Sequence, residues 1–131
     1  MLTFGHFLAV AIGAALGAIG RWLLGLWLNH AGAALPWGTL AVNLAGGYLI
    51  GAVLGVVSLY PEVPVWLRLL LVTGFLGGLT TFSTFSAETF GMLERGAYLH
   101  ALAYSGLSLL GSLALTALGF ATVHGLLRSG L

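Results

Sequence analysis

The chain has 131 residues, of which 60% are hydrophobic and only 5% are charged, and its mean hydropathy is +1.09. Because a soluble domain carries about 25% charged residues, this composition excludes a water-soluble protein and indicates an all-α integral membrane protein. The net charge of +1 is too small for a nucleic-acid-binding protein, and the absence of cysteine excludes disulfides, thiol catalysis and cysteine metal sites.

The apolar segments predict a single domain over residues 1–131, with four transmembrane helices at about 4–28, 37–60, 65–93 and 97–127. Small residues at every fourth position predict close contacts between these helices. One such row is Gly13 and Gly17, and the other is Gly47, Gly51 and Gly55. Four spans place both termini on the same side of the membrane.

The third span contains an unusual glycine-rich and polar stretch, TGFLGGLTTFSTFSAE, at residues 73–88. Its glycines loosen a helix, and they are followed by five hydroxyl side chains: Thr80, Thr81, Ser83, Thr84 and Ser86. We expect a broken third helix, with the break near residues 74–83 at membrane depth, where irregular backbone must be buried in protein or line a wet cavity. A break frees backbone carbonyls, and those near Gly77 and Thr80 suit a cation such as Na⁺.

Polar side chains of the fourth span form a stripe with a spacing of four residues, which follows one face of a helix: His100, Tyr104, Ser108, Ser112 and Thr116. The second span adds the neutral side chains of Thr39 and Asn43. Hydroxyls, a phenol and an amide suit a small anion that must exchange its water shell for hydrogen-bond donors. Phe82 and Phe85 add ring edges, which are positive. Together these residues predict an anion pathway with weak, favourable binding.

Each of these features also has a simpler structural interpretation. Phe82 and Phe85 would serve only for packing on most membrane helices, and Asn43 alone would make a helix–helix hydrogen bond. The hydroxyl stripe would bond to the carbonyls of its own helix. Arg21 and Glu88 are candidate vestibule residues. Arg21 is otherwise an anchor that extends to the interface, and Glu88 is otherwise a proton-coupling group or a side chain that reaches water.

The arginines give almost no bias between the two ends of the predicted bundle. Arg68 and Arg128 lie on the side of the termini, whereas Arg95 and the more deeply placed Arg21 lie on the other side. Because basic residues near the spans set orientation, a balanced chain can insert both ways. An antiparallel homodimer is compatible with this balance, and four short spans are few to enclose a pathway alone.

The run GFLGGLTTFSTFSAE at residues 74–88 closely resembles the hallmark motif of the CrcB/Fluc family of fluoride channels. Two further segments resemble the motifs of the family's first and second spans: GAIGRW at residues 17–22 and WGTLAVNLAG at residues 37–46. The pattern around Ser108 and Ser112 resembles that of the fourth span. The resemblance extends over the whole chain.

This resemblance implies an antiparallel, dual-topology homodimer in a bacterial inner membrane, with two fluoride pathways. Phe82 and Phe85 would form an aromatic box. The pore would also be lined by residues of the second and fourth spans: Asn43, Tyr104, Ser108 and Ser112. The carbonyls of Gly77 and Thr80 from both subunits would hold a buried structural Na⁺. The implied role is passive export of toxic fluoride from the cytoplasm.

A coupled transporter remains as an alternative function, and an enzyme is disfavoured. A proton-coupled fluoride exporter would use Glu88. Small multidrug exporters are also four-span, dual-topology dimers, but they use a carboxylate in the first span, and this first span contains no Asp or Glu. An enzyme is not expected, because the sequence has no nucleophile–base pair, metal cluster or phosphate-binding loop.

Overall fold

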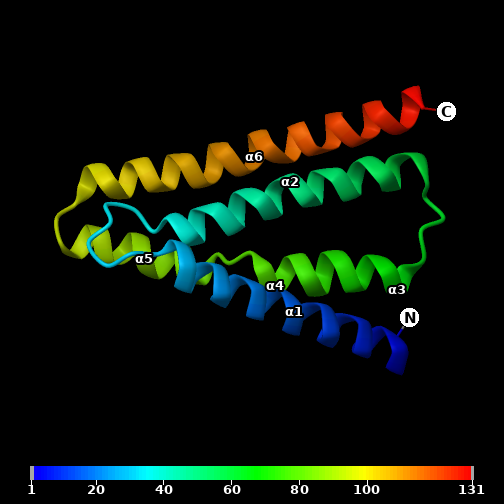
Figure 1. Cartoon of the computed structure of the whole chain (residues 1–131), viewed down its shortest axis with the longest axis horizontal. Coiled ribbons are helices and arrows are strands. Elements are labelled where there is room, and N and C mark those ends of the chain that lie inside the picture. The colour runs from blue at the N-terminus through cyan, green and yellow to red at the C-terminus, as the bar shows by residue number, and fades with distance from the viewer. Residues whose placement is uncertain (1, 131) are drawn as a thin grey trace.

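The computed structural model describes residues 2–130, and every regular element in that range is helical (Figure 1). Long helices form the first, second and fourth spans: α1 (Phe4–Leu28), α2 (Trp37–Leu59) and α6 (Tyr98–Ser129). The third span is composed of α3 (Val65–Arg68), the π-helix η1 (Leu69–Leu76), α4 (Gly77–Leu79) and α5 (Ser83–Glu94). The expectation of four apolar segments long enough to cross a membrane is confirmed.

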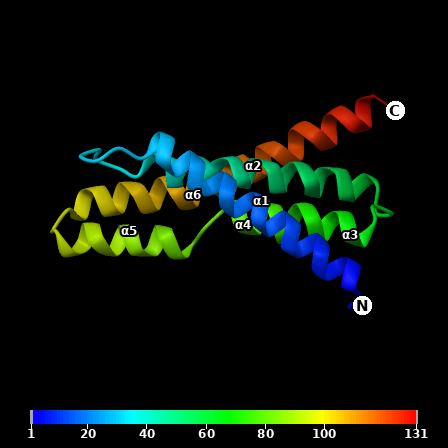
Figure 2. The same ribbon diagram turned by 60° about the horizontal axis from the view of Figure 1, so that its bottom comes forward.

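The loops and termini are confined to the two ends of the bundle. Both ends of the described chain lie together with the turn at residues 60–64, and the loops at 29–36 and 95–97 lie at the opposite end (Figures 1 and 2). Gly32 (φ 85°) and Gly96 (φ 77°) occupy the left-handed region within these latter loops. Glycine is favoured there because it has no Cβ to clash with the backbone.

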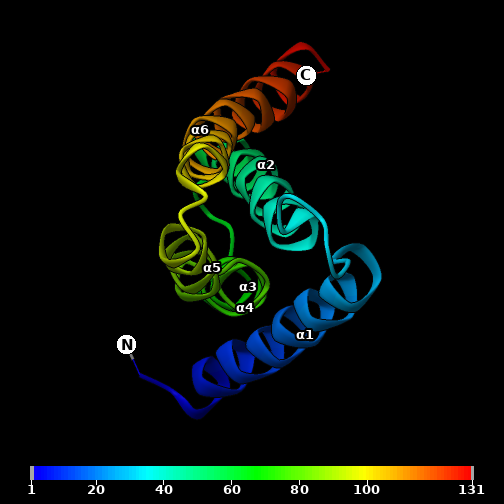
Figure 3. The same cartoon turned by 90° about the vertical axis from the view of Figure 1, so that its left-hand side faces the viewer.

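Helices α2 and α6 pack side by side through the second row of glycines (Figures 1 and 3). A Cβ placed on Gly51 would overlap the Thr116 carbonyl and lie 3.0 Å from the Phe120 backbone nitrogen. The Thr116 hydroxyl donates across this contact to the carbonyl of Gly47, at 2.9 Å. The row therefore lets the two helix backbones touch, as small residues do in membrane bundles.

The third span does not follow regular α-helical geometry along its length. Residues 69–76 form a π-helix, which the sequence analysis did not anticipate. Helix α4 ends at Leu79, Thr80 is extended (φ −86°, ψ 155°), and α5 begins at Ser83. We call residues 80–82 the interhelical link. The Thr80 amide makes the last regular helical bond, to the Leu76 carbonyl at 3.0 Å, and the Thr80 hydroxyl donates to the same carbonyl at 2.7 Å.

Buried apolar side chains form two clusters on either side of the link. One cluster lies between α2, α5 and α6 and contains buried residues from all three helices and a loop: Leu35, Leu40, Met92, Ala101 and Tyr104. The other joins Val42 of α2 to Leu76 and Leu79. Many large apolar side chains outside these clusters are exposed. Lipid would cover such side chains in a protein that spans a bilayer.

Candidate functional site

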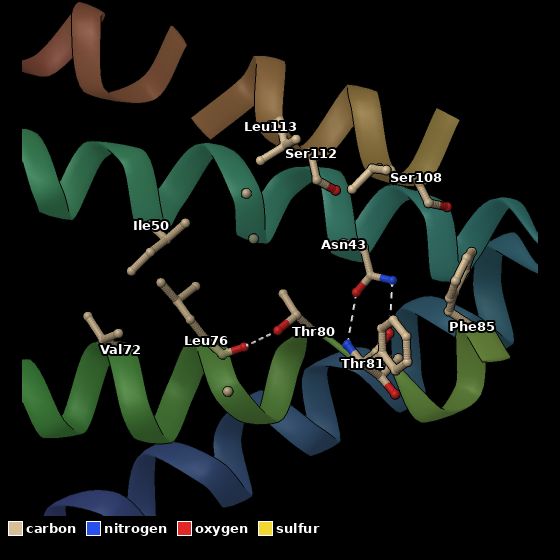
Figure 4. Close-up of a pocket in the computed structure, with 15 residues that line it drawn as sticks. Asn43, Ile50, Val72, Leu76, Thr80, Thr81, Phe85, Ser108, Ser112 and Leu113 are labelled. Carbon is tan, nitrogen blue, oxygen red and sulfur yellow. Dashed lines mark hydrogen bonds between the residues drawn. The ribbon is translucent and has the colours of Figure 1, made fainter. Parts of the chain in front are cut away.

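A groove with a volume of about 520 Å³ lies between α2, the third span and α6 (Figure 4). Its walls include seven of the residues that the sequence predicts for a pore or a cation site: Asn43, Gly77, Thr80, Phe82, Phe85, Ser108 and Ser112. Apolar side chains such as Ile50, Val72 and Leu113 complete it. The fold therefore brings these seven residues together from three separate segments of sequence.

The side chain of Asn43 holds the interhelical link through a pair of hydrogen bonds (Figure 4). Its Nδ2 donates to the Thr81 carbonyl at 3.1 Å, and its Oδ1 accepts from the Thr81 amide at 2.8 Å. The pair satisfies both backbone groups of a residue that lies outside any helix, as buried backbone requires. Asn43 thus connects α2 to the link and lines the groove at the same time.

This pair of bonds has a consequence for the carbonyl at the end of α4. In a continuous helix the Thr81 amide would donate to the Gly77 carbonyl four residues earlier. Here that amide donates to Asn43 instead, so the Gly77 carbonyl lacks its helical partner. Gly77 and Thr80 both line the groove. The sequence-based expectation that carbonyls are freed near these two residues fits this geometry.

The two phenylalanines lie at the α5 side of the groove. Their ring centroids are 5.7 Å apart with an interplanar angle of 50°, and Phe85 in turn contacts the Tyr104 ring at 5.2 Å. Phe85 is half-buried, whereas 78% of Phe82 is exposed. A tilted pair leaves ring edges as well as faces accessible, and the edges carry positive potential.

The hydroxyl stripe of α6 divides into residues with different partners. The Ser108 hydroxyl is buried and has no hydrogen-bond partner within residues 2–130, and both Ser108 and Ser112 line the groove. The Thr116 hydroxyl instead donates to Gly47 and to the Ser112 carbonyl of its own helix, at 2.9 and 2.8 Å. The alternative interpretation of the stripe, bonding to its own helix, therefore holds at Thr116.

Thr39, Glu88 and Tyr104 form a separate network outside the groove. The hydroxyls of Thr39 and Tyr104 donate to the two carboxylate oxygens of Glu88, at 3.1 and 2.9 Å. Tyr104 is fully buried, and only 5% of Thr39 is exposed. Two donors that the sequence assigns to the anion pathway are thus bonded to a carboxylate, and Glu88 lies between α2, α5 and α6.

A smaller cavity of about 280 Å³ lies on the other side of the link, beside α1. Its polar lining contains one arginine, one amide and three hydroxyls: Arg21, Asn29, Thr39, Thr81 and Thr84. Thr81 lines both this cavity and the groove. Of the two candidate vestibule residues, Arg21 lines this cavity, whereas Glu88 lines neither the cavity nor the groove.

The sequence analysis did not identify Thr81 as the residue that Asn43 binds. A signal was available, because a residue in a helix break needs partners for both its amide and its carbonyl. Only an amide side chain offers a donor and an acceptor side by side, and Asn43 is the one such side chain in the second span. The register between the two spans, which decides which backbone it meets, is not visible in the sequence.

Comparison with known proteins identifies the family. The family described as CrcB-like protein, Camphor Resistance (CrcB), matches residues 8–120. The chain belongs to the CrcB family. A CrcB relative from Bordetella petrii, named fluoride-specific ion channel FluC, is 73% identical over 121 residues, which cover 92% of this chain and 93% of the relative. Relatives of the same name from Bordetella bronchiseptica and Chromohalobacter salexigens are 64% and 54% identical, over 98% and 93% of this chain and 100% and 92% of their own lengths.

Proposed function

We propose that this CrcB-family chain is a fluoride-selective ion channel that passively exports toxic fluoride from the cytoplasm. The observation that carries the proposal is a sequence identity of 73% and 64%, over 92% and 98% of this chain, to two relatives named fluoride-specific ion channels. The contents of the groove are the second support. Its Asn43 amide, free Ser108 hydroxyl and paired phenylalanine edges are suited to a small anion.

The groove contains donors but no fixed cation, which suits conduction. A channel must bind its ion strongly enough to replace water and weakly enough to release it. Arg21 is a cationic side chain that could bind an anion tightly, but it lines the smaller cavity instead of the groove. In the proposal, Arg21 and the hydroxyls around it form a vestibule, and the groove forms part of the narrow pathway.

We propose that two copies assemble as an antiparallel homodimer with two pores in the inner membrane of a bacterial cell. The exposed ring of Phe82 and the open groove supply a surface that a second copy would cover. The irregular backbone of the third span, which the link interrupts at membrane depth in this proposal, would then be buried in protein. Arginines are balanced between the two ends of the chain, which favours insertion in both orientations.

A structural Na⁺ at the dimer interface is part of the same proposal. The Gly77 and Thr80 carbonyls would bind it from both subunits, and the missing helical partner of the Gly77 carbonyl supports this assignment. Carbonyl oxygens at broken helices are suitable ligands for Na⁺. A high-resolution density map that shows water-like distances at these carbonyls, unchanged when Na⁺ is removed, would contradict the ion.

The direct test is ion efflux from liposomes that contain the purified protein, followed with fluoride and chloride electrodes in parallel. We expect fast fluoride efflux and no chloride efflux. Liposomes without protein give the background rate. Absence of fluoride efflux from protein that remains monodisperse and helical would overturn the proposal, and equal efflux of both anions would overturn the selectivity.

A proton-coupled fluoride exporter is the second candidate, and the position of Glu88 favours it. This carboxylate lies inside the bundle with hydroxyl donors on both oxygens. The reversal potential separates the two mechanisms. A channel reverses at the fluoride equilibrium potential at every pH gradient, whereas an exchanger reverses at a potential that moves with the pH gradient. A shift that disappears in Glu88→Gln would establish the exporter.

A further inference from the structure

Arg21 makes a long-range contact with the third span that the proposed pathway does not use. Its Nε donates to the Gly78 carbonyl at 3.1 Å, across a separation of 57 residues. Gly78 lies in α4 next to its last residue, so Phe82, the residue whose amide would complete the helical bond, is outside the helix. The arginine therefore satisfies a carbonyl that the end of α4 leaves without a helical partner.

The close approach of α1 to the third span makes this bond feasible. Arg21 continues the row of Gly13 and Gly17, four residues apart. A Cβ on Gly17 would lie 2.8 Å from the Leu79 backbone nitrogen, and a Cβ on Gly78 would lie 3.0 Å from the Ala18 nitrogen. Because the two backbones are nearly in contact, the Nε of Arg21 reaches the Gly78 carbonyl.

The carbonyls around the end of α4 are thus divided among separate donors. The Leu76 carbonyl accepts from Thr80, and the Gly78 carbonyl accepts from Arg21. The Gly77 carbonyl, between them, loses its helical partner because Asn43 takes the Thr81 amide. Arg21 from α1 and Asn43 from α2 therefore hold the chain on the two sides of Thr80.

We infer that Arg21 is a positioning residue, which fixes the end of α4 through its Nε donor and so sets the places of the Gly77 and Thr80 carbonyls. The bond is made by Nε, the guanidinium nitrogen attached to the aliphatic stem, so this role requires a donor at that position of the side chain. This inference rests on the proposed function only where fluoride flux is the measured quantity. It adds a contact from α1 to the two spans that form the groove.

Two substitutions separate the donor from the charge. Glutamine carries its Nε2 the same number of bonds from the backbone as the arginine Nε, without charge. Lysine keeps the charge but places a methylene at that position. We expect Arg21→Gln to retain the wild-type amide exchange of Thr80 and Thr81 within about twofold, and Arg21→Lys to exchange there about tenfold faster. Fluoride flux should follow the same order.

Two matched controls accompany this experiment. Arg68 is exposed on α3, and Arg68→Gln and Arg68→Lys should leave exchange in the link unchanged. Gly17→Ala should accelerate exchange in the link even though Arg21 is intact, whereas Gly20→Ala should not, because its Cβ would meet only the Leu79 side chain at 3.8 Å. Exchange along α2 and α6 reports whether each variant keeps its fold.

The outcomes assign the role of Arg21. Wild-type exchange and flux in Arg21→Lys, together with faster exchange and lower flux in Arg21→Gln, would overturn the inference. The arginine would then be an electrostatic attractor for anions. Equally fast exchange in both variants, or wild-type exchange in both, would also overturn the inference, because a donor at the Nε position then has no effect of its own. Wild-type protein without fluoride flux would refute the proposed function, and the exchange measurement would still decide what Arg21 does.

Discussion

Asn43 and Thr81 are joined by two hydrogen bonds that run in opposite directions, from Nδ2 to the Thr81 carbonyl and from the Thr81 amide to Oδ1. The side chain thus substitutes for the backbone partners that Thr81 would have inside a helix. Because the same side chain lines the groove, the shape of the link and the chemistry of the groove depend on one residue.

Asn43→Asp tests this pair with minimal change of shape. The carboxylate keeps an acceptor for the Thr81 amide but replaces the donor to the Thr81 carbonyl with an oxygen. We expect unfolding to become easier by about 1–3 kcal/mol, and fluoride flux to fall about tenfold or more because a negative charge repels the ion. Thermal unfolding and liposome efflux measure the two effects.

Asn29→Asp is the matched control for this substitution. Asn29 uses its oxygen as an acceptor from the Gly38 amide, at 2.7 Å, and an aspartate keeps that acceptor. We expect wild-type thermal stability in this variant, so it is a control for the effect on unfolding. Wild-type stability and flux in Asn43→Asp would show that the paired bonds are not needed.

Phe82→Ile and Phe85→Ile test the aromatic edges of the groove. Isoleucine keeps the apolar bulk but has no ring edge of positive potential. We expect each variant to remain folded and to lose fluoride flux by about tenfold or more. Phe90→Ile is the control, since Phe90 is exposed on α5 and lies outside the groove. Unchanged flux in both groove variants would leave the rings with a packing role only.

The network of Glu88 is testable by a double-mutant cycle. Tyr104→Phe removes one of the two hydroxyls that donate to the Glu88 carboxylate. Glu88→Gln replaces the carboxylate that accepts this bond with a neutral amide. We expect the two effects on unfolding to be non-additive, with a coupling of about 0.5–3 kcal/mol. The same cycle with Tyr98→Phe, on an exposed tyrosine, should give additive effects. Additivity in the Tyr104 cycle would refute the contact.

The glycine row of α2 is testable by adding one methyl group. Gly51→Ala would overlap the backbone of α6 at Thr116, so we expect a loss of about 1–3 kcal/mol in stability. Gly125→Ala is the control, because no atom lies within 4 Å of a Cβ there. That variant should unfold at the same temperature or higher, since alanine favours a helix over glycine by about 1 kcal/mol. Equal stability of the two variants would exclude close packing at Gly51.

The sequence by itself determined the class of protein and the location of its chemistry. A chain with 5% charged residues and four long apolar segments has few solutions other than membrane helices. The glycines and hydroxyls at residues 74–86 disfavour a continuous helix, and the interhelical link at residues 80–82 lies among them, whereas the π-helix at residues 69–76 was not anticipated. The CrcB resemblance also followed from local motifs, and the family match confirms it.

Only the tertiary structure decided which polar groups meet. Thr39 and Tyr104 fall on plausible pore-facing rows, yet both donate to Glu88, and Arg21 contacts Gly78 from 57 residues away. Spacing within one helix fixes the face on which a side chain lies, but not the register of the neighbouring helix. That register depends on how glycine rows of different helices pack together, and this packing decided the partners of each donor.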